Sequence, residues 1–307
     1  MIDFLKSEII HLDPDKLEAN EYLDFERKVN MKTGEIGVYI NSYYRGLEFR
    51  IYETTVSNPI RRITLEGSLH KYWNDGKHNY NDFTDVELKW VVWDILLKFN
   101  ISPLMMCLKQ LEIGVNISPP VPTKEILMYC LLHKTKLLKS VFTKDEGNYK
   151  QVQHCNYFIK IYDKQKHYNS KGYHILNQIF RFEIKYKREK LSNVLNKKGR
   201  ITLQEVLDFS LHNFKSKLIQ EWNNILFYDS KTLEKSKYKD RYSNPNFWLN
   251  LKPENFKYHR RILNKLINSN SENIKKQIEL LISNKIDKLC YNTTQIQPLY
   301  IVLNKVV

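Results

Sequence analysis

The sequence predicts an α+β fold, with a central antiparallel sheet, helices on one face of it, and a mostly helical C-terminal part. Up to about residue 190, short segments alternate apolar and polar residues, which is typical of strands, and two helical patterns lie among them. After about residue 195, apolar residues recur three and four positions apart, which is helical spacing. We therefore expect an α+β domain at residues 1–194 and a helical domain at residues 195–307.

The first part is expected to contain all the strands. A capping-box sequence at residues 84–87 opens a helix that ends before Pro103. A second helix is expected at residues 124–136, after a proline-rich turn. The strands expected around these helices are residues 2–10, 36–43, 47–53, 60–70, 108–118, 137–143, 156–163 and 177–187.

The second part is expected to be helical almost throughout. A capping box at residues 202–205 opens a helical segment that runs to about Phe227. Residues 231–242 are charged and polar, which favours a loop or an exposed face. Two further helices are expected at residues 253–268 and 271–290.

The composition favours a soluble protein with a polyanionic partner. The 307 residues include 49 Lys and Arg against 34 Asp and Glu, a net charge of +15, and nucleic acid is the commonest partner of so basic a chain. With 42% hydrophobic residues, a disordered chain is excluded. No apolar run approaches the roughly 20 residues of a spanning helix, so no membrane partner is expected. The four scattered cysteines, without a CxxC pair, indicate reduced thiols and a cytoplasmic location.

Three of the expected strands place ionisable side chains on a single face. Because side chains alternate along a strand, residues two positions apart point the same way. If these strands are neighbours, two carboxylates, a tyrosine and several cations converge on one surface of the sheet. The residues on these polar faces are Glu112, Gly114 and Asn116; Lys160, Tyr162 and Lys164; and Arg181, Glu183 and Lys185.

Such a surface suits phosphodiester chemistry. Carboxylates bind Mg²⁺ or Mn²⁺, the metal polarises a phosphate, and lysines offset the charge that develops on it. A tyrosine hydroxyl can attack phosphorus and form a covalent link that stores the energy of the broken bond. The chain contains no GxxxxGK[ST] loop for nucleotide hydrolysis. The alternative interpretation is a half-exposed antiparallel sheet whose Lys and Glu side chains form ordinary cross-strand pairs.

Other catalytic patterns are absent from the sequence. There is no His-apolar-His triplet, no HExxH helix, no Cys/His cluster with zinc spacing and no GxSxG turn. The adjacent Arg260 and Arg261, beside His259, are interpreted as part of a helix that faces phosphates rather than as a recombinase site.

Several short motifs occur in an order that resembles a known family. They are residues 1–3, 46–53, 66–72, 83–85, 111–113, 159–164, 181–183 and 258–263. Over nearly the whole chain, this order is similar to the gene II-type replication initiators of filamentous bacteriophages. The likeness to the tyrosine-dependent rolling-circle initiators of small plasmids is looser. At the position of Glu112 the family usually carries Asp.

The resemblance implies an enzyme that nicks and rejoins DNA at an origin to start rolling-circle replication. It implies that Tyr162 is the nucleophile, which leaves a 5′-phosphotyrosine and a 3′-OH for a host polymerase. Glu112 and Glu183 would hold Mg²⁺ or Mn²⁺, while Lys164 and Arg181 would contact the phosphate or orient the carboxylates. Implied partners are origin DNA, single-stranded or supercoiled, and the host replication helicase and polymerase, in the cytoplasm of a bacterial host.

Further residues are candidates for DNA contact, and several have an ordinary alternative. The predicted DNA-binding residues are Lys71, His70, Lys160, Arg260 and Arg261, with the helical domain helping to grip DNA. Lys71 and Lys164 can equally be solvated surface lysines, and His70 a surface histidine. Tyr157 and Tyr168 are the rivals of Tyr162. The tryptophans, which are Trp73, Trp90, Trp93, Trp222 and Trp248, are interpreted as core residues, although Trp73 can also stack on an unpaired base.

Two other functions remain open from the sequence. A mobilisation relaxase or transposase would use the same tyrosine chemistry on another DNA substrate. A non-catalytic DNA-binding protein that controls replication would share the charge but form no covalent adduct.

Overall fold

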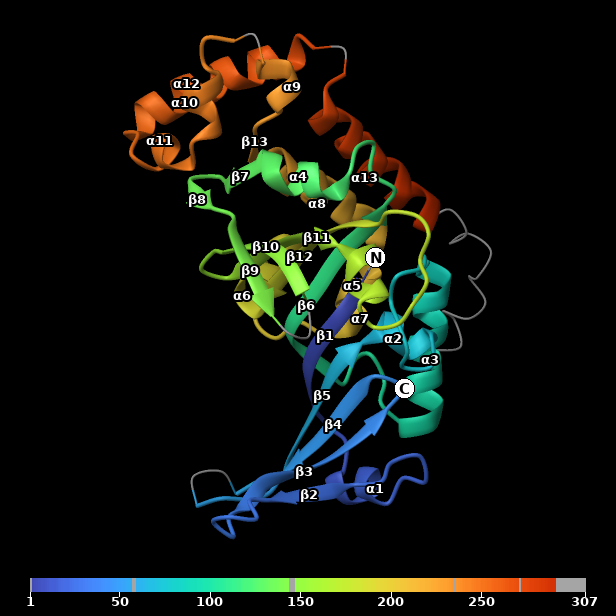
Figure 1. Cartoon of the computed structure of the whole chain (residues 1–307). Helices are drawn as coiled ribbons and strands as arrows, with labels where there is room; N and C mark the ends of the chain where they lie inside the picture. The colour runs from blue at the N-terminus through green and yellow to red at the C-terminus, as the bar shows by residue number, and fades with distance from the viewer. Residues whose placement is uncertain (1, 57–58, 144–146, 235, 271, 291–307) are drawn as a thin grey trace. The chain divides into compact units, whose positions relative to one another are not determined.

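The computed structural model describes residues 2–56, 59–143, 147–234, 236–270 and 272–290 (Figure 1). The chain forms two compact units, each assembled from separate segments. Within the ranges just given, unit 1 contains residues 2–113, 185–213 and 288–290, and unit 2 contains residues 114–184 and 214–287. The predicted functional boundary between residues 194 and 195 stays a prediction, and the end of the predicted helical domain, residues 291–307, lies outside the described residues.

Unit 1 is built on antiparallel strands. Their order is β2-β3-β4-β5-β1-β6, and strand β6 crosses into unit 2 at residue 114. Because the chain returns between neighbours through short turns, most of these strands pair with a sequence neighbour. The bounds are β1 Ile2–Ile9, β2 Glu26–Val29, β3 Ile36–Tyr44, β4 Leu47–Tyr52, β5 Arg62–Ser68 and β6 Met106–Ile117.

Helices cover one face of these strands. Helix α3 (Asp85–Phe99) begins with the predicted capping box, in which Thr84 and Glu87 bond reciprocally. Its Phe99 packs on Phe49 of β4 with ring centroids 4.8 Å apart. The opposite face carries charged side chains such as Arg50, which pairs with Glu48 and Glu66. Unit 1 also contains α1 (Pro14–Glu18), α2 (Leu69–Trp73), α6 (Arg188–Leu195), α7 (Leu203–Asp208) and the 3₁₀ turn Leu211–Asn213.

Unit 2 continues the strand order as β6-β12-β11-β10-β9 and adds a small second sheet, β13-β7-β8. Trp222 of α8 packs on Phe182 of β12, with ring centroids 5.6 Å apart, and both side chains are fully buried. The strands are β7 Cys130–His133, β8 Lys136–Leu137, β9 Lys139–Thr143, β10 Gly147–Gln153, β11 Tyr157–Asp163, β12 Phe180–Lys187 and β13 Ile225–Phe227. The helices are α4 Thr123–Tyr129, α5 Lys164–Asn169, α8 Phe214–Asn223, α9 Ser230–Leu233, α10 Lys239–Ser243, α11 Pro245–Leu249, α12 Pro253–Asn268 and α13 Ile274–Cys290.

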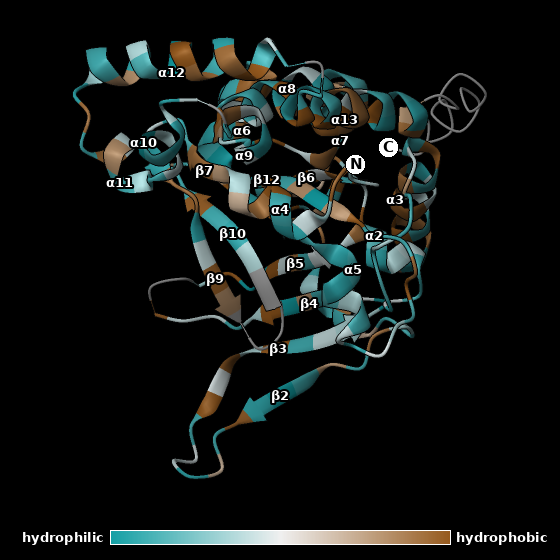
Figure 2. Cartoon of the chain, turned by 45° about the horizontal axis from the view of Figure 1, so that its top comes forward, coloured by the Kyte–Doolittle hydropathy of each residue, from teal (hydrophilic) through white to brown (hydrophobic). Residues whose placement is uncertain are grey.

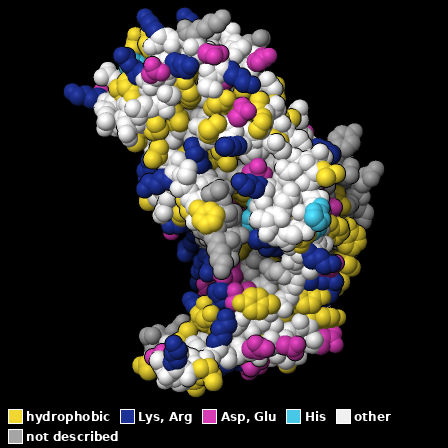
Figure 3. All heavy atoms as spheres, viewed as in Figure 1, with side chains coloured by type: hydrophobic (Ala, Val, Ile, Leu, Met, Phe, Trp, Pro, Cys, Tyr) yellow, Lys and Arg dark blue, Asp and Glu magenta, His cyan; other side chains and the backbone are white. Residues whose placement is uncertain are grey.

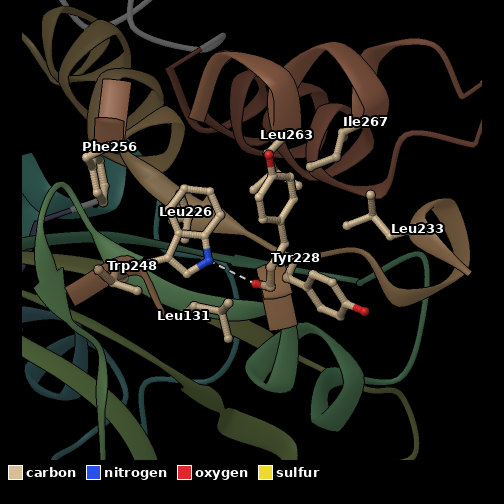
Figure 4. Close-up of a cluster of buried hydrophobic side chains, with 10 residues drawn as sticks. Leu131, Leu226, Tyr228, Leu233, Trp248, Phe256, Leu263 and Ile267 are labelled. Carbon is tan, nitrogen blue, oxygen red and sulfur yellow. Dashed lines mark hydrogen bonds between the residues drawn. The ribbon is translucent and has the colours of Figure 1, made fainter. Parts of the chain in front are cut away.

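A second hydrophobic cluster holds the C-terminal helices of unit 2 on the small sheet (Figure 4). Trp248 lies in it, and its indole Nε1–H donates to the backbone oxygen of Tyr242 at 2.9 Å. Leu263 and Ile267 lie on the apolar side of α12 and belong to this cluster. Hydrophobic and hydrophilic residues alternate along the helix (Figure 2). Burial of this one side fixes which residues of α12 face solvent.

The predicted fold class is confirmed, since the sheet is large and antiparallel and helices dominate the C-terminal part. Two local predictions were wrong. The helix expected at 124–136 ends at residue 129, and β7 begins at residue 130. The helix expected to reach Phe227 breaks into α7, a 3₁₀ turn, α8 and β13. At 231–242, where a loop or an exposed face was expected, part of the segment is helical and most of the described residues are exposed or half-buried, with Asp229 capping α9 through its side chain.

Among the described residues, no helix combines the length and the apolar character that spanning a membrane requires.

Candidate active site and nucleic-acid surfaces

Tyr162 lies near the end of β11, where it is half-buried. The register of β10 and β11 pairs it with Tyr149. On the same face, Lys160 places its ammonium 4.2 Å from the ring centroid of Tyr149 and 5.2 Å from that of Tyr162. Tyr162 therefore combines partial exposure with a nearby positive charge, as a nucleophile that meets a phosphate requires.

The neighbouring strand β12 brings Arg181 and Glu183 to this face. The backbone N–H of Lys164 donates to the carbonyl of Ile179 at 2.8 Å, which aligns the end of β11 with the start of β12. An antiparallel register that continues from this bond places Tyr162 opposite Arg181 and Lys160 opposite Glu183. The predicted polar faces of these two strands thus have matching phase within unit 2.

Arg181 and Glu183 form a buried polar network with Asn116. The guanidinium of Arg181 is fully buried and donates from Nε to Glu183 Oε2 at 2.9 Å and from Nη1 to Asn116 Oδ1 at 3.2 Å. Gly114 permits the close approach of β6, because a Cβ there would lie 2.6 Å from the carbonyl oxygen of Phe182. Since Arg181 bonds the carboxylate directly, it acts in this geometry as a positioning residue for Glu183.

Lys164 follows Tyr162 by two residues and begins α5. Asp163 caps this helix by accepting a bond from the backbone N–H of Lys166 at 2.8 Å. The side chain of Lys164 is fully buried, so the alternative of a solvated surface lysine is wrong. Burying an ammonium is costly, and the predicted catalytic role of Lys164 stays a prediction.

The two rival tyrosines are buried. Tyr157 is 6% exposed, and its hydroxyl accepts a 2.6 Å bond from Lys134 Nζ. Tyr168 is 3% exposed and packs edge-on against His167 and Tyr173. Of the three candidates, Tyr162 is the one whose side chain reaches the surface.

Glu112 belongs to unit 1 and has a different environment. Its Oε1 lies 2.7 Å from Lys185 Nζ, and the exposed fractions of the two side chains are 14% and 37%. This is the cross-strand Lys–Glu pair of the alternative interpretation. The predicted cluster of Glu112, Tyr162 and Glu183 joins residues of both units and stays a prediction.

The predicted metal ligands fit a divalent cation to different degrees. Among the described residues, no three or more His, Cys, Asp or Glu side chains gather as a metal site. Mg²⁺ is nonetheless often held by one or two carboxylates together with waters and substrate phosphates. Glu183 uses Oε2 for Arg181, so Oε1 is the oxygen that would meet a cation. Glu112 would have to exchange its partner Lys185 for the cation.

The predicted DNA contacts of α2 differ in accessibility. Lys71 is half-buried. His70 is fully buried, with Nε2 2.7 Å from Asn81 Oδ1 and its ring stacked on Phe83 at 4.8 Å. The surface position expected for His70 is therefore wrong, because this side of α2 faces the interior of unit 1.

Helix α12 separates the two adjacent arginines. Arg260 is half-buried and donates to the backbone oxygen of Asn223 at 3.1 Å, which ties α12 to the end of α8. Arg261 is exposed, with Lys257 and Lys265 one turn before and after it. Spacing of four residues aligns these three cations in one stripe. The sequence prediction missed Lys257 and Lys265, although the period of four was visible in it.

Basic residues are abundant around this stripe. Residues 230–290 contain 14 Lys and Arg and 6 Asp and Glu. In Figure 3, Lys and Arg side chains mark the part of the surface formed by helices α9 to α12, whereas acidic side chains gather near α1. The sequence of this helical part of unit 2 therefore has an excess of positive charge.

A polar network in unit 1 also escaped the sequence prediction. Asp3, 3% exposed, accepts hydrogen bonds from the hydroxyl of Ser68 and, at 2.8 Å, from Asn79 Nδ2. Ser68 in turn caps α2 by accepting from the backbone N–H of Lys71 at 3.0 Å. Nothing in the spacing of these residues signals the network, because strand pairing brings Asp3 and Ser68 together across 65 positions.

Comparison with known proteins gives distant likenesses. No protein-family model and no curated protein matches the sequence. A rolling circle replication initiator protein from Geobacillus stearothermophilus is similar in structure, with 13% identity, a TM-score of 0.43, and coverage of 86% of this chain and 96% of that one. The di-domain ARO/CYC protein BexL from the BE-7585A biosynthetic pathway matches at 10% identity and TM-score 0.19, covering 63% and 75%. Likenesses of this size carry no argument on function, which rests on the residues of this chain.

Proposed function

We propose that this protein nicks and rejoins DNA at an origin to initiate rolling-circle replication, through a covalent bond between Tyr162 and a 5′-phosphate. The observation that carries the proposal is the position of Tyr162. It is the accessible one of three candidate tyrosines, and it lies beside the ammonium of Lys160. An antiparallel register that continues from the bond between Lys164 and Ile179 would put it opposite Arg181.

The proposed reaction exchanges one phosphoester bond for another. The hydroxyl oxygen of Tyr162 attacks the phosphorus, a tyrosyl O–P bond forms, and the bond from phosphorus to the 3′ oxygen breaks. The phenolic proton is given up and the leaving 3′ oxygen takes one up, so no proton is gained or lost overall. Because the energy of the broken ester stays in the new one, the reverse attack by a 3′-OH rejoins the strand without a nucleotide.

The residues around Tyr162 have separate roles in this proposal. Lys160 offsets negative charge on the phosphate as the new bond forms. Arg181 holds the carboxylate of Glu183 in one orientation. Glu183, with Glu112, would hold Mg²⁺ or Mn²⁺, which when bound polarises the phosphate.

DNA containing the protein's own origin tests the proposal. Wild-type protein with Mg²⁺ or Mn²⁺ should give an adduct that survives SDS and heat, with the nucleotide on the peptide that contains Tyr162. Tyr162→Phe should give none, because it removes the nucleophile and keeps the ring. Tyr168→Phe, at a buried tyrosine of the same unit, is the matched control and should retain the adduct.

The two carboxylates are tested in the same assay. Glu183→Gln should lower the adduct yield by about a hundredfold, the size of effect expected when one charge-stabilising group is lost. An equal loss in Glu112→Gln supports it as second ligand, whereas an unchanged yield assigns it to its pair with Lys185. Adduct formation by Tyr162→Phe at the wild-type rate would refute the assignment. Absence of any wild-type adduct would favour the non-catalytic DNA-binding function.

A further inference from the structure

Unit 1 contains an aromatic pocket that the proposed chemistry does not use. It opens between α2, α3 and the turn that joins β3 to β4, and its volume is about 300 Å³. That volume is at the lower end of the range for small-ligand sites. The lining residues are Arg45, Tyr72, Trp73, Trp90, Val91, Trp93 and Asp94.

The tryptophans of this pocket are unusually exposed. Trp73 and Trp90 are each 40% exposed, whereas Trp222 and Trp248 of unit 2 are fully buried. The core position expected for Trp90 is therefore wrong, and for Trp73 the exposure fits the alternative of stacking on an unpaired base better than a core position. Trp93 stands edge-on to Trp90, at 5.3 Å between ring centroids and 82° between planes, which fixes the orientation of the Trp90 face. Leaving two such large apolar rings in water is unfavourable unless a ligand covers them.

The polar groups beneath the rings are already paired. The Tyr72 hydroxyl donates to Asp94 Oδ2 at 2.7 Å, and Lys98 bonds the other oxygen of that carboxylate. Burial and the bond to Asp94 raise the pKa of Tyr72, so it stays a donor. Although burial opposes it, the bonds from Lys98 and Tyr72 lower the pKa of Asp94, which stays charged and compensated. Because Tyr72, Asp94 and Lys98 pair with one another, the rings and the rim decide what binds.

Arg45 supplies a positive charge at the rim. It occupies the first position of a two-residue hairpin turn, with φ of 46°, and Gly46 follows with φ of 84°. Both positions of such a turn favour Asn, Asp or Gly, so an arginine there is unfavourable in conformation. Its guanidinium lies 5.9 Å from the Tyr72 ring and 3.3 Å from Asp75 in an exposed pair that contributes little. The side chain is thus placed at the pocket and available to an anion.

We propose that this pocket binds one unpaired nucleobase of a DNA single strand, with the base against Trp73 and Trp90 and a backbone phosphate at Arg45. The proposal rests on the proposed function for its choice of DNA. Flat π-faces stack on any base, and a cation at the rim matches the phosphate that every nucleotide carries. A purely apolar partner would cover the rings but would make no use of the positive charge of Arg45 at the rim.

Short oligonucleotides separate base binding from charge. Wild-type protein is titrated with a dT oligonucleotide of ten residues and with the same oligonucleotide in which every base is replaced by an abasic site. Tryptophan fluorescence and anisotropy of a 5′ label report binding. Both ligands carry the same phosphates, so a pocket for a base predicts tighter binding of dT by roughly fivefold to a hundredfold, the worth of one stacked base.

Variants assign that preference to the pocket. Trp73→Ala combined with Trp90→Ala should remove the preference for dT and leave the abasic affinity unchanged. Arg45→Ala should weaken both ligands and lower the salt slope by about one. Tyr43→Ala is the matched control, since Tyr43 is an aromatic residue of unit 1 that is 62% exposed and lies outside the pocket. Circular dichroism and thermal melting verify that each variant is folded, and Trp73→Phe should keep most of the preference.

The outcomes distinguish this proposal from the proposed function. Equal wild-type affinity for the two ligands, or a preference that survives loss of both tryptophans, overturns the pocket, even if the protein nicks its origin. If the preference for dT disappears when both tryptophans are replaced, the pocket proposal is supported, even if Tyr162→Phe and wild type form the adduct equally. The proposal would also be overturned if neither oligonucleotide bound and another protein occupied the pocket instead.

Discussion

Strand β12 carries two ion pairs in very different surroundings. Arg181 and Glu183, in unit 2, have side chains exposed by 0% and 8%. Four residues after Arg181, Lys185 pairs with Glu112 in unit 1, and these side chains are 37% and 14% exposed. In the sequence the two cations look alike, since both occupy the polar phase of one alternating strand.

Burial separates the two pairs in energetic terms. A half-exposed pair costs little to form and contributes little, because water competes for both groups. A buried pair must offset a large loss of hydration, and apolar residues of the same volume would often serve stability as well or better. Stability alone therefore does not explain the buried pair of Arg181 and Glu183. In the proposed function, Arg181 orients the carboxylate of Glu183 next to Tyr162.

The largest effect on the free energy of unfolding is expected when each cation is removed in turn. Arg181→Met should lower the free energy of unfolding by about 3–5 kcal/mol, because Glu183 would be left charged and buried. Lys185→Met should lower it by about 1 kcal/mol or less. Urea unfolding at pH 7.5, followed by tryptophan fluorescence, measures both. Similar losses in the two variants would show that burial does not separate the pairs.

Long, strongly patterned elements could be predicted from the sequence. Helix α12 occupies the expected residues 253–268, since proline at its start and a regular apolar period define it. Helix α3 begins where its capping box predicted. Short elements could not be predicted: the apolar run of β7 follows α4 directly, and its pairing with β13 and β8 makes it a strand.

Burial was the least predictable property of the candidate site. Alternation is a local rule, and it predicts that Tyr162, Arg181 and Glu183 share one polar face of the neighbouring strands β11 and β12; their joint site stays a prediction. The same rule says nothing of what covers a strand, so Lys164 and His70 were expected at the surface and are fully buried. Exposure of Trp90 was missed for the converse reason, since residue type alone favours the interior.

Unit 2 contains a second group of buried ionisable side chains, whose pKa shifts predict how stability depends on pH. His133 Nδ1 lies 2.8 Å from His154 Nε2, and His133 Nε2 lies 3.1 Å from Glu221 Oε2. Burial, with the charge of His133, lowers the pKa of His154 to about 4, and burial also lowers that of His133. Although burial opposes it, bonds from His133 and Asn224 lower the pKa of Glu221 to about 2.

These shifts predict a loss of stability in mild acid. Below about pH 6.5 the unfolded histidines bind protons that the folded ones do not, so stability is complete above that pH and falls toward pH 4. Glu221 adds to the loss only below about pH 4.5. Because His154 is partly exposed, we expect about 1 kcal/mol between pH 7.5 and 5.

Urea unfolding at the two pH values measures this loss, and His154→Gln should reduce it. His174→Gln, at an exposed histidine of the same unit, is the matched control and should leave the pH dependence as it is. A wild-type stability that is constant from pH 7.5 to 5 would contradict the buried neutral state of the pair.

The smallest effect is expected on the salt dependence of DNA binding by α12, where one of two adjacent arginines is half-buried and the other is exposed. Each exposed cation that contacts a phosphate displaces a counterion, so Arg261→Ala should lower the slope of log affinity against log salt by about 0.9. Arg260→Ala should leave the slope unchanged, because its guanidinium is directed to the carbonyl of Asn223. Anisotropy with a duplex of unrelated sequence, between 50 and 300 mM salt, measures both slopes. Lys257→Ala should behave as Arg261→Ala does, since the two lie on one exposed stripe. If Arg260→Ala lowers the slope and Arg261→Ala does not, the DNA lies on the other side of α12.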